Sequence, residues 1–255
     1  VVVTLDGQGA DEQLAGYHYF FGFYFKYLLL NYKFKKLINE VYSYTKLHKS
    51  TYGLQMLTYF MLPKVIKSLV AYNKRGYIRK SFFNKYKNSS LITDNLYSSK
   101  SLADGLTDHF EYKLEHLLKW EDRNSMWFSL EARVPFLDHR LVERTLASPP
   151  EMIISEGLTK KILRESLKGV LPEIIRTRKD KIGFETNEDE WFKSEPFKEM
   201  ILDTLHSLSF QQRGYIDHKK ALSIYNSHLD GSINASQEIW KWINLELWFK
   251  MFLTN

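Results

Sequence analysis

Leu5-Asp6-Gly7-Gln8-Gly9-Ala10-Asp11-Glu12 is the most informative stretch of this 255-residue chain. It follows a β-branched run, residues 1–4, that is typical of a buried strand. The glycines predict a tight turn, and an apolar helical spacing starts near Ala10. Free N–H groups and the positive end of a helix dipole converge at such a junction. The stretch therefore predicts an anion site beside Asp6, Gly7, Gln8 and Gly9.

Two carboxylates, Asp11 and Glu12, stand in the first turn of the expected helix. Carboxylates repel a phosphate unless a metal ion lies between the carboxylate and the phosphate. Mg²⁺ is held in this way, by one or two carboxylates plus phosphate oxygens. Asp11 is therefore the candidate Mg²⁺ ligand. The alternative is an acidic pair that only complements the helix dipole. The dinucleotide fingerprint G-x-G-x-x-G is not met, because Glu12 occupies its third glycine position.

Helix dominates the rest of the chain, so the fragment is predicted to be mainly α with one or few parallel strands at its N-terminus. The first helix is expected to bury Leu14, Tyr17, Phe21, Tyr24 and Leu28. Other helices are expected around 34–47, 54–72, 76–86 and 102–118, with a polar loop over 88–101. The last helix, within 232–252, is expected to pack through Ile239, Trp240, Ile243, Leu247 and Met251. No second clear strand follows, so the partner strands are expected upstream of Val1.

Composition narrows the functional class. The net charge of +6 is modest, and basic residues are mixed with acidic ones, which does not favour a nucleic-acid partner. The densest basic cluster, 176–181, indicates either a solvated surface or a site for a nucleotide polyphosphate. The absence of cysteine excludes disulfides and thiolate chemistry within these residues and suits a cytoplasmic location. No apolar run is long enough for a membrane span.

A charged cluster over 121–139 alternates ionisable with apolar residues. Because buried charges need partners, Glu131, Arg133 and Asp138 are expected either in a buried ion-pair network or facing a polar ligand. Pro135 predicts an extended segment before it, and Asp138 is then placed to cap a helix.

Lys160 and Arg164 are expected on one face of an amphipathic helix over 159–165. Two cations one turn apart repel each other unless an anion lies between them, and a triphosphate or pyrophosphate would supply it. The alternative is a pair of solvated cations beside Glu165.

Taken in order, these segments resemble the synthetase domain of the glutamine-dependent asparagine synthetases. The family's L-S-G-x-G-x-D-E and G-G-Y are matched by residues 5–12 and by Ala15-Gly16-Tyr17. Its D-R-x-S-M and E-A-R-V-P-F-L-D are matched by 122–126 and 131–138. Its K-x-x-L-R, L-P and K-x-G-F are matched by Lys160, Leu163-Arg164, Leu171-Pro172, Lys181 and Gly183-Phe184.

The resemblance implies that residues 1–255 are the C-terminal portion of an α/β synthetase domain of the ATP-pyrophosphatase (adenine nucleotide α-hydrolase-like) group. It implies that a carboxylate attacks the α-phosphate of ATP, giving an acyl-adenylate that ammonia converts to an amide. The expected reaction makes asparagine from aspartate, with ammonia released from glutamine. ATP and Mg²⁺ are the implied ligands, and a homodimer is left open.

The same resemblance implies roles for single residues. Asp11 would hold Mg²⁺, and Asp6, Gly7, Gln8, Gly9, Lys160 and Arg164 would surround the nucleotide. Lys160, Gln8 and Glu131 stand at catalytic positions, with Lys160 stabilising charge that develops on the phosphates. The acceptor pocket would be lined or braced by Asp122, Arg123, Arg133 and Asp138.

Two departures from the family pattern matter. The phosphate loop S-G-G-x-D-S and the cysteine-dependent glutaminase domain lie upstream in the family and are not in these residues, so the fragment alone is expected to be inactive. Asp6 and Gln8 also replace the Ser and Glu of better-known members. Because a glutamine cannot act as a carboxylate base, the acceptor could instead be a sugar acid, a peptide carboxylate or a β-lactam precursor. A non-catalytic module that binds a nucleotide or a partner is the remaining alternative.

Overall fold

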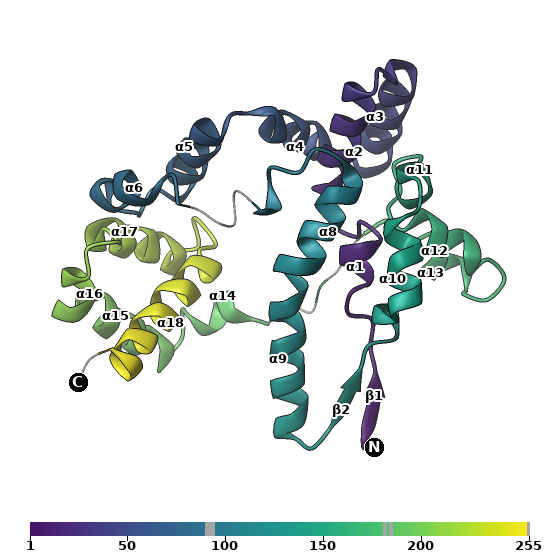
Figure 1. The fold of residues 1–255 in the computed structure, drawn as a ribbon. Coiled ribbons are helices and arrows are strands. Elements are labelled where there is room, and N and C mark those ends of the chain that lie inside the picture. The colour runs from purple at the N-terminus through teal and green to yellow at the C-terminus, as the bar shows by residue number, and fades with distance from the viewer. Residues whose placement is uncertain (90–94, 181–182, 184–185, 254–255) are drawn as a thin grey trace. The chain divides into compact units, whose positions relative to one another are not determined.

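The structure is a computed structural model and describes residues 1–89, 95–180, 183 and 186–253 (Figure 1). Contacts between Cα atoms divide the chain into two compact units. The first unit comprises Val1–Lys67 and Ser90–Lys181, and the second comprises Ser68–Ser89 and Ile182–Asn255. Both are mostly helical, as expected. The candidate site residues named from the sequence all belong to the first unit.

Two short strands, β1 (Val3–Leu5) and β2 (Glu131–Arg133), form a parallel pair in register Val3↔Glu131 to Leu5↔Arg133 (Figure 1). The parallel strand was correctly expected, but its partner within this chain was not. Residues 131–133 alternate charge with alanine, so they carry no β-branched signal. Leu5 is exposed, so β1 is not the buried strand that its composition suggests.

The helical pattern after β1 is divided in two. Helix α1 (Ala10–Gln13) ends before Ala15, which has a positive φ of 54°, and α2 (Phe20–Leu30) starts afterwards. The expectation of one continuous helix from Ala10 was therefore wrong. The expected buried face was confirmed at Leu14, Phe21, Tyr24 and Leu28, whereas Tyr17 is only partly buried.

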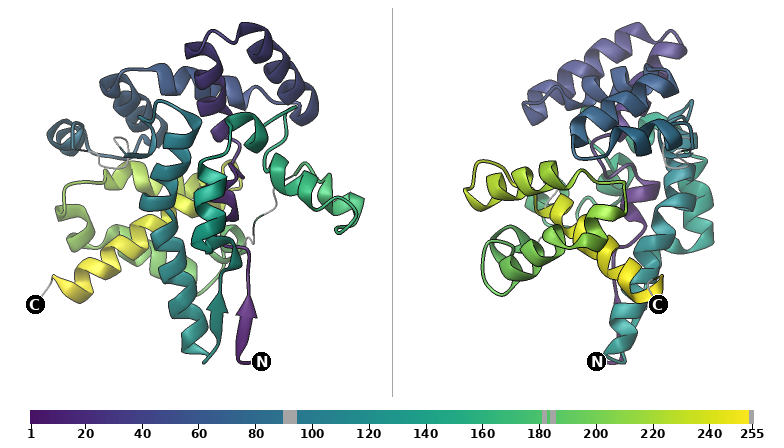
Figure 2. Two further views of the ribbon diagram at one scale, coloured as in Figure 1. Left: turned by 45° about the vertical axis from the view of Figure 1, so that its right-hand side comes forward. Right: turned by 90° about the vertical axis from the view of Figure 1, so that its left-hand side faces the viewer.

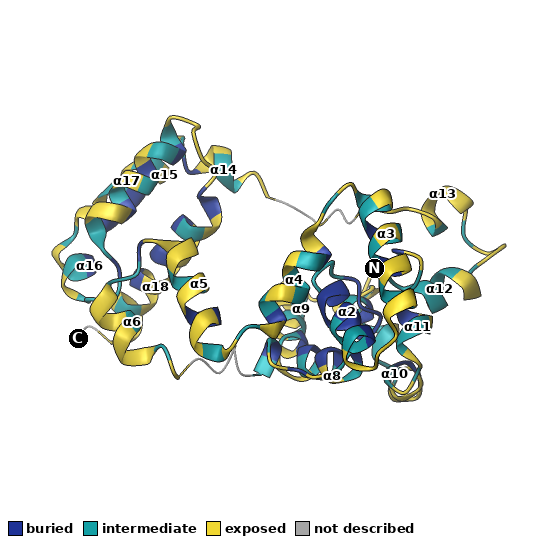
Figure 3. Cartoon of the chain, turned by 90° about the horizontal axis from the view of Figure 1, so that it is seen from above, coloured by how far each residue is buried: buried dark blue, intermediate teal, exposed yellow. Residues whose placement is uncertain are grey.

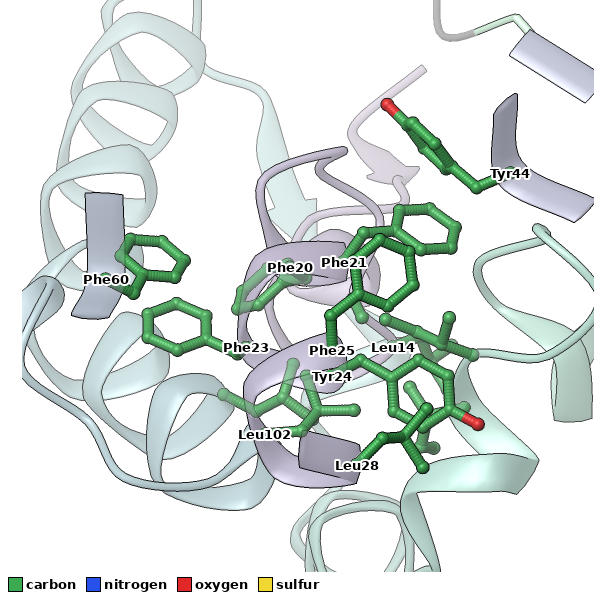
Figure 4. Packing of buried hydrophobic residues seen from close by; sticks show 14 residues of the cluster. Leu14, Phe20, Phe21, Phe23, Tyr24, Phe25, Leu28, Tyr44, Phe60 and Leu102 are labelled. Atoms are coloured by element: carbon green, nitrogen blue, oxygen red, sulfur yellow. The ribbon is translucent and has the colours of Figure 1, made fainter. Parts of the chain in front are cut away.

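Helix α2 is the centre of the first unit (Figures 3 and 4). It packs against α3 (Phe34–His48), α4 (Tyr52–Met61) and α8 (Leu102–Tyr112). Its aromatic rings fill the core, and the rings of Phe23 and Phe60 stack with centroids 3.9 Å apart. Gly22 allows α4 to approach, since a Cβ there would lie 2.7 Å from that of Met56. Burial of these large rings is the main favourable term holding this unit together.

Three predicted helices have different bounds in the structure. The stretch 54–72 is broken at Pro63 between α4 and α5 (Lys64–Arg75), because the residue before a proline avoids the helical region. The stretch 76–86 contains only α6 (Lys80–Tyr86), and 102–118 is divided at Lys113 between α8 and α9 (Leu114–Trp127). The loop expected over 88–101 includes 90–94, which lie outside the described residues.

Short elements complete the first unit after β2. They are the 3₁₀ turn η1 (Pro135–Leu137) and the helices α10 (His139–Leu146), α11 (Pro150–Ile153), α12 (Lys161–Ser166) and α13 (Glu173–Arg176) (Figure 2). Asp138 caps α10 by accepting the N–H of Arg140, which confirms the capping prediction.

The second unit has its own apolar core around Trp242. In addition to α6, its helices are α14 (Glu188–Trp191), α15 (Phe197–His206), α16 (Leu208–Gln212), α17 (His218–Leu229) and α18 (Ser236–Phe252). The expected packing face of α18 was wrong in part. Ile239 and Ile243 are buried, but Trp240, Leu247 and Met251 are exposed, and Trp242 and Glu246 complete the buried side instead.

Candidate functional site

The turn after β1 is built by local hydrogen bonds and one close contact. A carboxylate oxygen of Asp6 accepts the N–H of Gln8 at 2.8 Å. Gly9, with φ 86°, is the residue before α1, and a Cβ there would lie 2.1 Å from a methyl group of Leu137. Only glycine fits both the left-handed backbone and this contact. By contrast, a Cβ on Gly7 would meet nothing within 4 Å, so one side of the turn is open.

The fold brings the side chains of two predicted site residues, Asp11 and Lys160, into direct contact. Their carboxylate and ammonium lie 2.5 Å apart, and the side chains are 27% and 28% exposed. The backbone N–H of Lys160 also donates to the carbonyl of Leu14 at 3.1 Å. Lys160 has a left-handed backbone conformation, with φ 55°, and is the residue before α12. Its hydrogen bond to Leu14 therefore places the start of α12 beside the end of α1. A cation and an anion with partial access to solvent at the start of a helix can exchange partners with a phosphate and a metal ion.

Gly16 lies directly against this pair. A Cβ at Gly16 would lie 1.8 Å from the Asp11 carboxylate oxygen and 2.8 Å from Cε of Lys160. Because glycine alone fits there, Gly16 sets how closely the two charged side chains can approach. The sequence had shown Gly16 only as part of the Ala15-Gly16-Tyr17 match, without a physical role.

Glu12, which follows Asp11 in the sequence, is a buried carboxylate. The Tyr17 hydroxyl donates to it at 2.6 Å. Burial, followed by the hydrogen bond to Glu12, raises the pKa of Tyr17 well above its usual range. The ammonium of Lys113 lies 3.6 Å from the centroid of the Tyr17 ring. This group rigidifies the link between α1 and α2, and the sequence pattern did not predict it.

Of the two alternatives for residues 131–138, the structure does not contain the buried ion-pair network. Glu131 and Arg133 form an ion pair at 2.8 Å, but their side chains are 54% and 61% exposed. Residues two apart in a strand point to the same face, and this face of the two-stranded sheet is open to solvent. Asp138 instead binds the guanidinium of Arg140, and this hydrogen bond lowers the pKa of Asp138 well below its usual range. Asp122 and Arg123 are exposed on α9.

Arg164 does not share a helical face with Lys160, because α12 begins only at Lys161. Its Nε donates to the carbonyl of Thr159 at 2.8 Å, and a terminal nitrogen donates to the carbonyl of Arg176. Burial lowers the pKa of Arg164 from its usual value. In this structure Arg164 therefore ties α12 to α13.

The basic cluster at 176–181 borders a surface concavity of about 630 Å³ lined by Ile174, Ile175, Thr177, Arg178, Lys179 and Asp180. Arg176 pairs with Glu173 at 2.8 Å, and Arg178 pairs with Asp180 at 3.0 Å. Carboxylates of the chain itself thus neutralise both arginines, which favours the solvated-surface alternative. Lys181 and Phe184 lie outside the described residues.

Among the described residues, no cluster of three or more His, Cys, Asp or Glu side chains could hold a metal ion. Asp11 would therefore need phosphate oxygens and water as further Mg²⁺ ligands, which is the usual manner of Mg²⁺ binding. No described helix has the length and apolar character to cross a membrane.

The site so defined is a strand–glycine turn–helix junction at which a carboxylate and an ammonium from distant segments meet. Residues 1–250 match the family model described as asparagine synthase. The chain therefore belongs to the asparagine synthase family.

Curated relatives agree with this assignment over parts of the chain. Asparagine synthetase [glutamine-hydrolyzing] 3 of Bacillus subtilis is 45% identical over 31% of this chain and 13% of its own length. Asparagine synthetase [glutamine-hydrolyzing] 1 of the same organism is 31% identical over 50% of this chain and 20% of its own length. The human asparagine synthetase [glutamine-hydrolyzing] is 30% identical over 48% of this chain and 25% of its own length. The matched segments thus cover a quarter of these relatives or less, and no solved structure matches the chain.

Proposed function

We propose that this chain forms part of an ATP-dependent ligase that converts aspartate to asparagine through an acyl-adenylate. Family membership supports amide synthesis in general. The observation that carries the proposal is the meeting of Asp11 and Lys160 at the turn after β1. A carboxylate that can hold a metal ion and a cation that can neutralise phosphate charge are the two groups that adenylation needs there.

The residues of this chain divide the work in the proposed reaction. Mg²⁺, held by Asp11 and the phosphates, would withdraw charge from the triphosphate. Lys160 would leave Asp11 and bind the phosphate oxygens, stabilising the negative charge that builds up as pyrophosphate departs. The open side of Gly7 leaves the turn accessible, and Gly9 and Gly16 hold it in shape. Asp6 and Gln8 would border the nucleotide and the acceptor.

We further propose that β1 and β2 belong to a larger sheet and that the phosphate loop comes from preceding chain. Two strands of three residues with an exposed face do not make an independently stable sheet. Exposed Leu5 is an apolar position that a neighbouring strand would cover. A glutaminase domain is the proposed ammonia source, because the relatives are named as glutamine-hydrolysing.

A different acceptor is the second candidate, and Gln8 is the observation in its favour. Its amide cannot be a carboxylate base, so a sugar acid or a peptide carboxylate could replace aspartate. Turnover of such acids in preference to aspartate would select this alternative. A non-catalytic module is a third reading, and an adenylation assay separates it from both ligases.

The test is ATP-dependent release of pyrophosphate and AMP by the full-length protein that carries residues 1–255, with aspartate and ammonia or glutamine. Lys160→Ala should lower turnover by roughly 10²- to 10³-fold, the usual cost of losing one electrostatic stabiliser. Lys168→Ala, at an exposed position just after α12, is the matched control and should retain turnover. Equal activity of the wild type and Lys160→Ala would rule out the proposal. Residues 1–255 alone should release no pyrophosphate.

A further inference from the structure

The tight turn over 155–158 directly precedes the segment that carries Lys160. Ser155 and Leu158 exchange backbone hydrogen bonds of 3.1 and 2.9 Å. The two central residues, Glu156 and Gly157, both have positive φ, 57° and 73°. Such a turn directs the central N–H groups away from its own carbonyls, so they need acceptors elsewhere.

A buried carboxylate of α3, Glu40, supplies both acceptors. Its two oxygens accept the N–H groups of Glu156 at 3.1 Å and Gly157 at 3.3 Å. Burial raises the pKa of Glu40, and the two N–H groups of the turn oppose that shift. A carboxylate bound to two N–H groups is a stronger acceptor than a neutral group, because its bonds are charge-assisted.

The same turn is held by α3 at two further points. His48 donates from Nε2 to the carbonyl of Gly157 at 2.8 Å. A Cβ on Gly157 would lie 2.9 Å from the carbonyl carbon and oxygen of Ser43, so the turn lies directly on the α3 backbone. One helix thus satisfies the turn's central N–H groups and one of its carbonyls, from residues far away in the sequence.

The turn and Lys160 are separated by a single residue, Thr159. The N–H of Lys160 donates to Leu14, and its ammonium reaches Asp11. The segment is therefore held on α3 at one end and on the end of α1 at the other. Because so short a segment has little slack, a shift of the turn would move the Lys160 ammonium.

We infer that Glu40 is a positioning residue for Lys160: by holding the turn 155–158 on α3, it keeps the Lys160 ammonium beside Asp11. The inference deepens the proposed function, on which it rests. Helix α3 lies outside the segments that match the family's motifs, and this role connects it to the site.

Glu40→Gln in the full-length protein tests the positioning role of Glu40. The amide keeps the shape of the side chain but offers the two N–H groups of the turn one acceptor oxygen in place of two. Glu111→Gln, at an exposed position on α8, is the matched control. Hydrogen exchange in the peptide 154–160 should become roughly 10- to 100-fold faster in Glu40→Gln, the factor for losing one charged hydrogen bond. Acylation of Lys160 by acetic anhydride should also become faster, because its ammonium leaves Asp11 more often.

The kinetic readout is the separation of kcat from KM. Adenylation kcat should fall roughly 10- to 100-fold in Glu40→Gln with little change in KM for ATP, because the lysine is misplaced by a small distance. Glu40→Asp, which keeps the charge, should recover part of the loss. Circular dichroism checks that each variant is folded.

The outcomes separate the positioning role of Glu40 from the proposed ligase function. Unchanged exchange and unchanged Lys160 acylation in folded Glu40→Gln would overturn the positioning role, whatever the activity. If both rise but the wild type releases no pyrophosphate with any acceptor, the positioning role stands and the proposed function fails.

Discussion

The ammonium of Lys160 lies 2.5 Å from the carboxylate of Asp11, although most of the first unit separates them in sequence. Each is only about a quarter exposed, so neither charge is fully solvated. A double-mutant cycle measures what this contact contributes. Asp11→Asn and Lys160→Met should each destabilise the first unit, and the double variant should cost less than their sum.

The expected coupling is about 0.5–3 kcal/mol, the range for residues in direct contact. Urea denaturation followed by a probe in the first unit gives the free energies of unfolding. Strict additivity of the two single changes would show that the pair contributes nothing to stability. The same variants should lose adenylation activity independently of their effect on stability.

Gly16→Ala should damage the site more than the fold. The new methyl group would overlap the Asp11 carboxylate, so the ion pair with Lys160 has to open. Overpacking of this kind costs about 1–3 kcal/mol. We expect a lower midpoint of thermal unfolding and faster acylation of Lys160. Gly7→Ala is the matched control, because a Cβ at that position meets nothing within 4 Å. Similar damage from both changes would contradict the packing argument.

His109 should make the first unit less stable in acid. Its ring is buried among Tyr19, Phe20 and Phe23, and its Nδ1 donates to the carbonyl of Gly105 at 2.7 Å. Burial lowers the pKa of His109 to about 4. The unfolded chain, with an ordinary histidine pKa of about 6.5, therefore binds a proton that the folded state refuses.

The stability contributed by neutral His109 is thus fully present above about pH 6.5 and is lost as the pH falls toward 4. The slope is at most about 1.4 kcal/mol per pH unit. His109→Gln should flatten the dependence of the unfolding free energy on pH between these values. His139→Gln, at an exposed position of α10, is the matched control. Identical slopes in wild type and His109→Gln would contradict the assignment.

The second unit should depend on one buried ion pair. Glu246 is 1% exposed and accepts from Arg213 at 2.6 Å and from Ser209 at 2.7 Å. Arg213→Ala leaves this carboxylate buried without its cation, which costs on the order of 3 kcal/mol. Lys241 is 54% exposed and pairs with Glu238 at the surface, so Lys241→Ala should cost less than about 1 kcal/mol. Equal costs in denaturant titrations would show that the Arg213–Glu246 pair is effectively solvated.

The sequence predicted those features that depend on a few neighbouring residues. The glycine turn after β1, the cap at Asp138 and the buried face of α2 follow from local sterics, local hydrogen bonds and apolar spacing. The family match also follows from motif order. Some local signals were missed: Gly16 directly follows Ala15, whose positive φ ends the helical run, and Pro63 divides the stretch 54–72.

Only the tertiary structure decided how distant segments meet. It paired β1 with the charged residues 131–133 and left their ion pair in solvent, whereas the alternation of charge had suggested burial. It also placed Lys160 on Asp11, separated Lys160 from the face of Arg164, and put Glu40 under the turn that leads to Lys160. The physical reason is range: propensity and capping act over one or two turns, whereas burial and ion pairing depend on which surfaces the packed helices bring together.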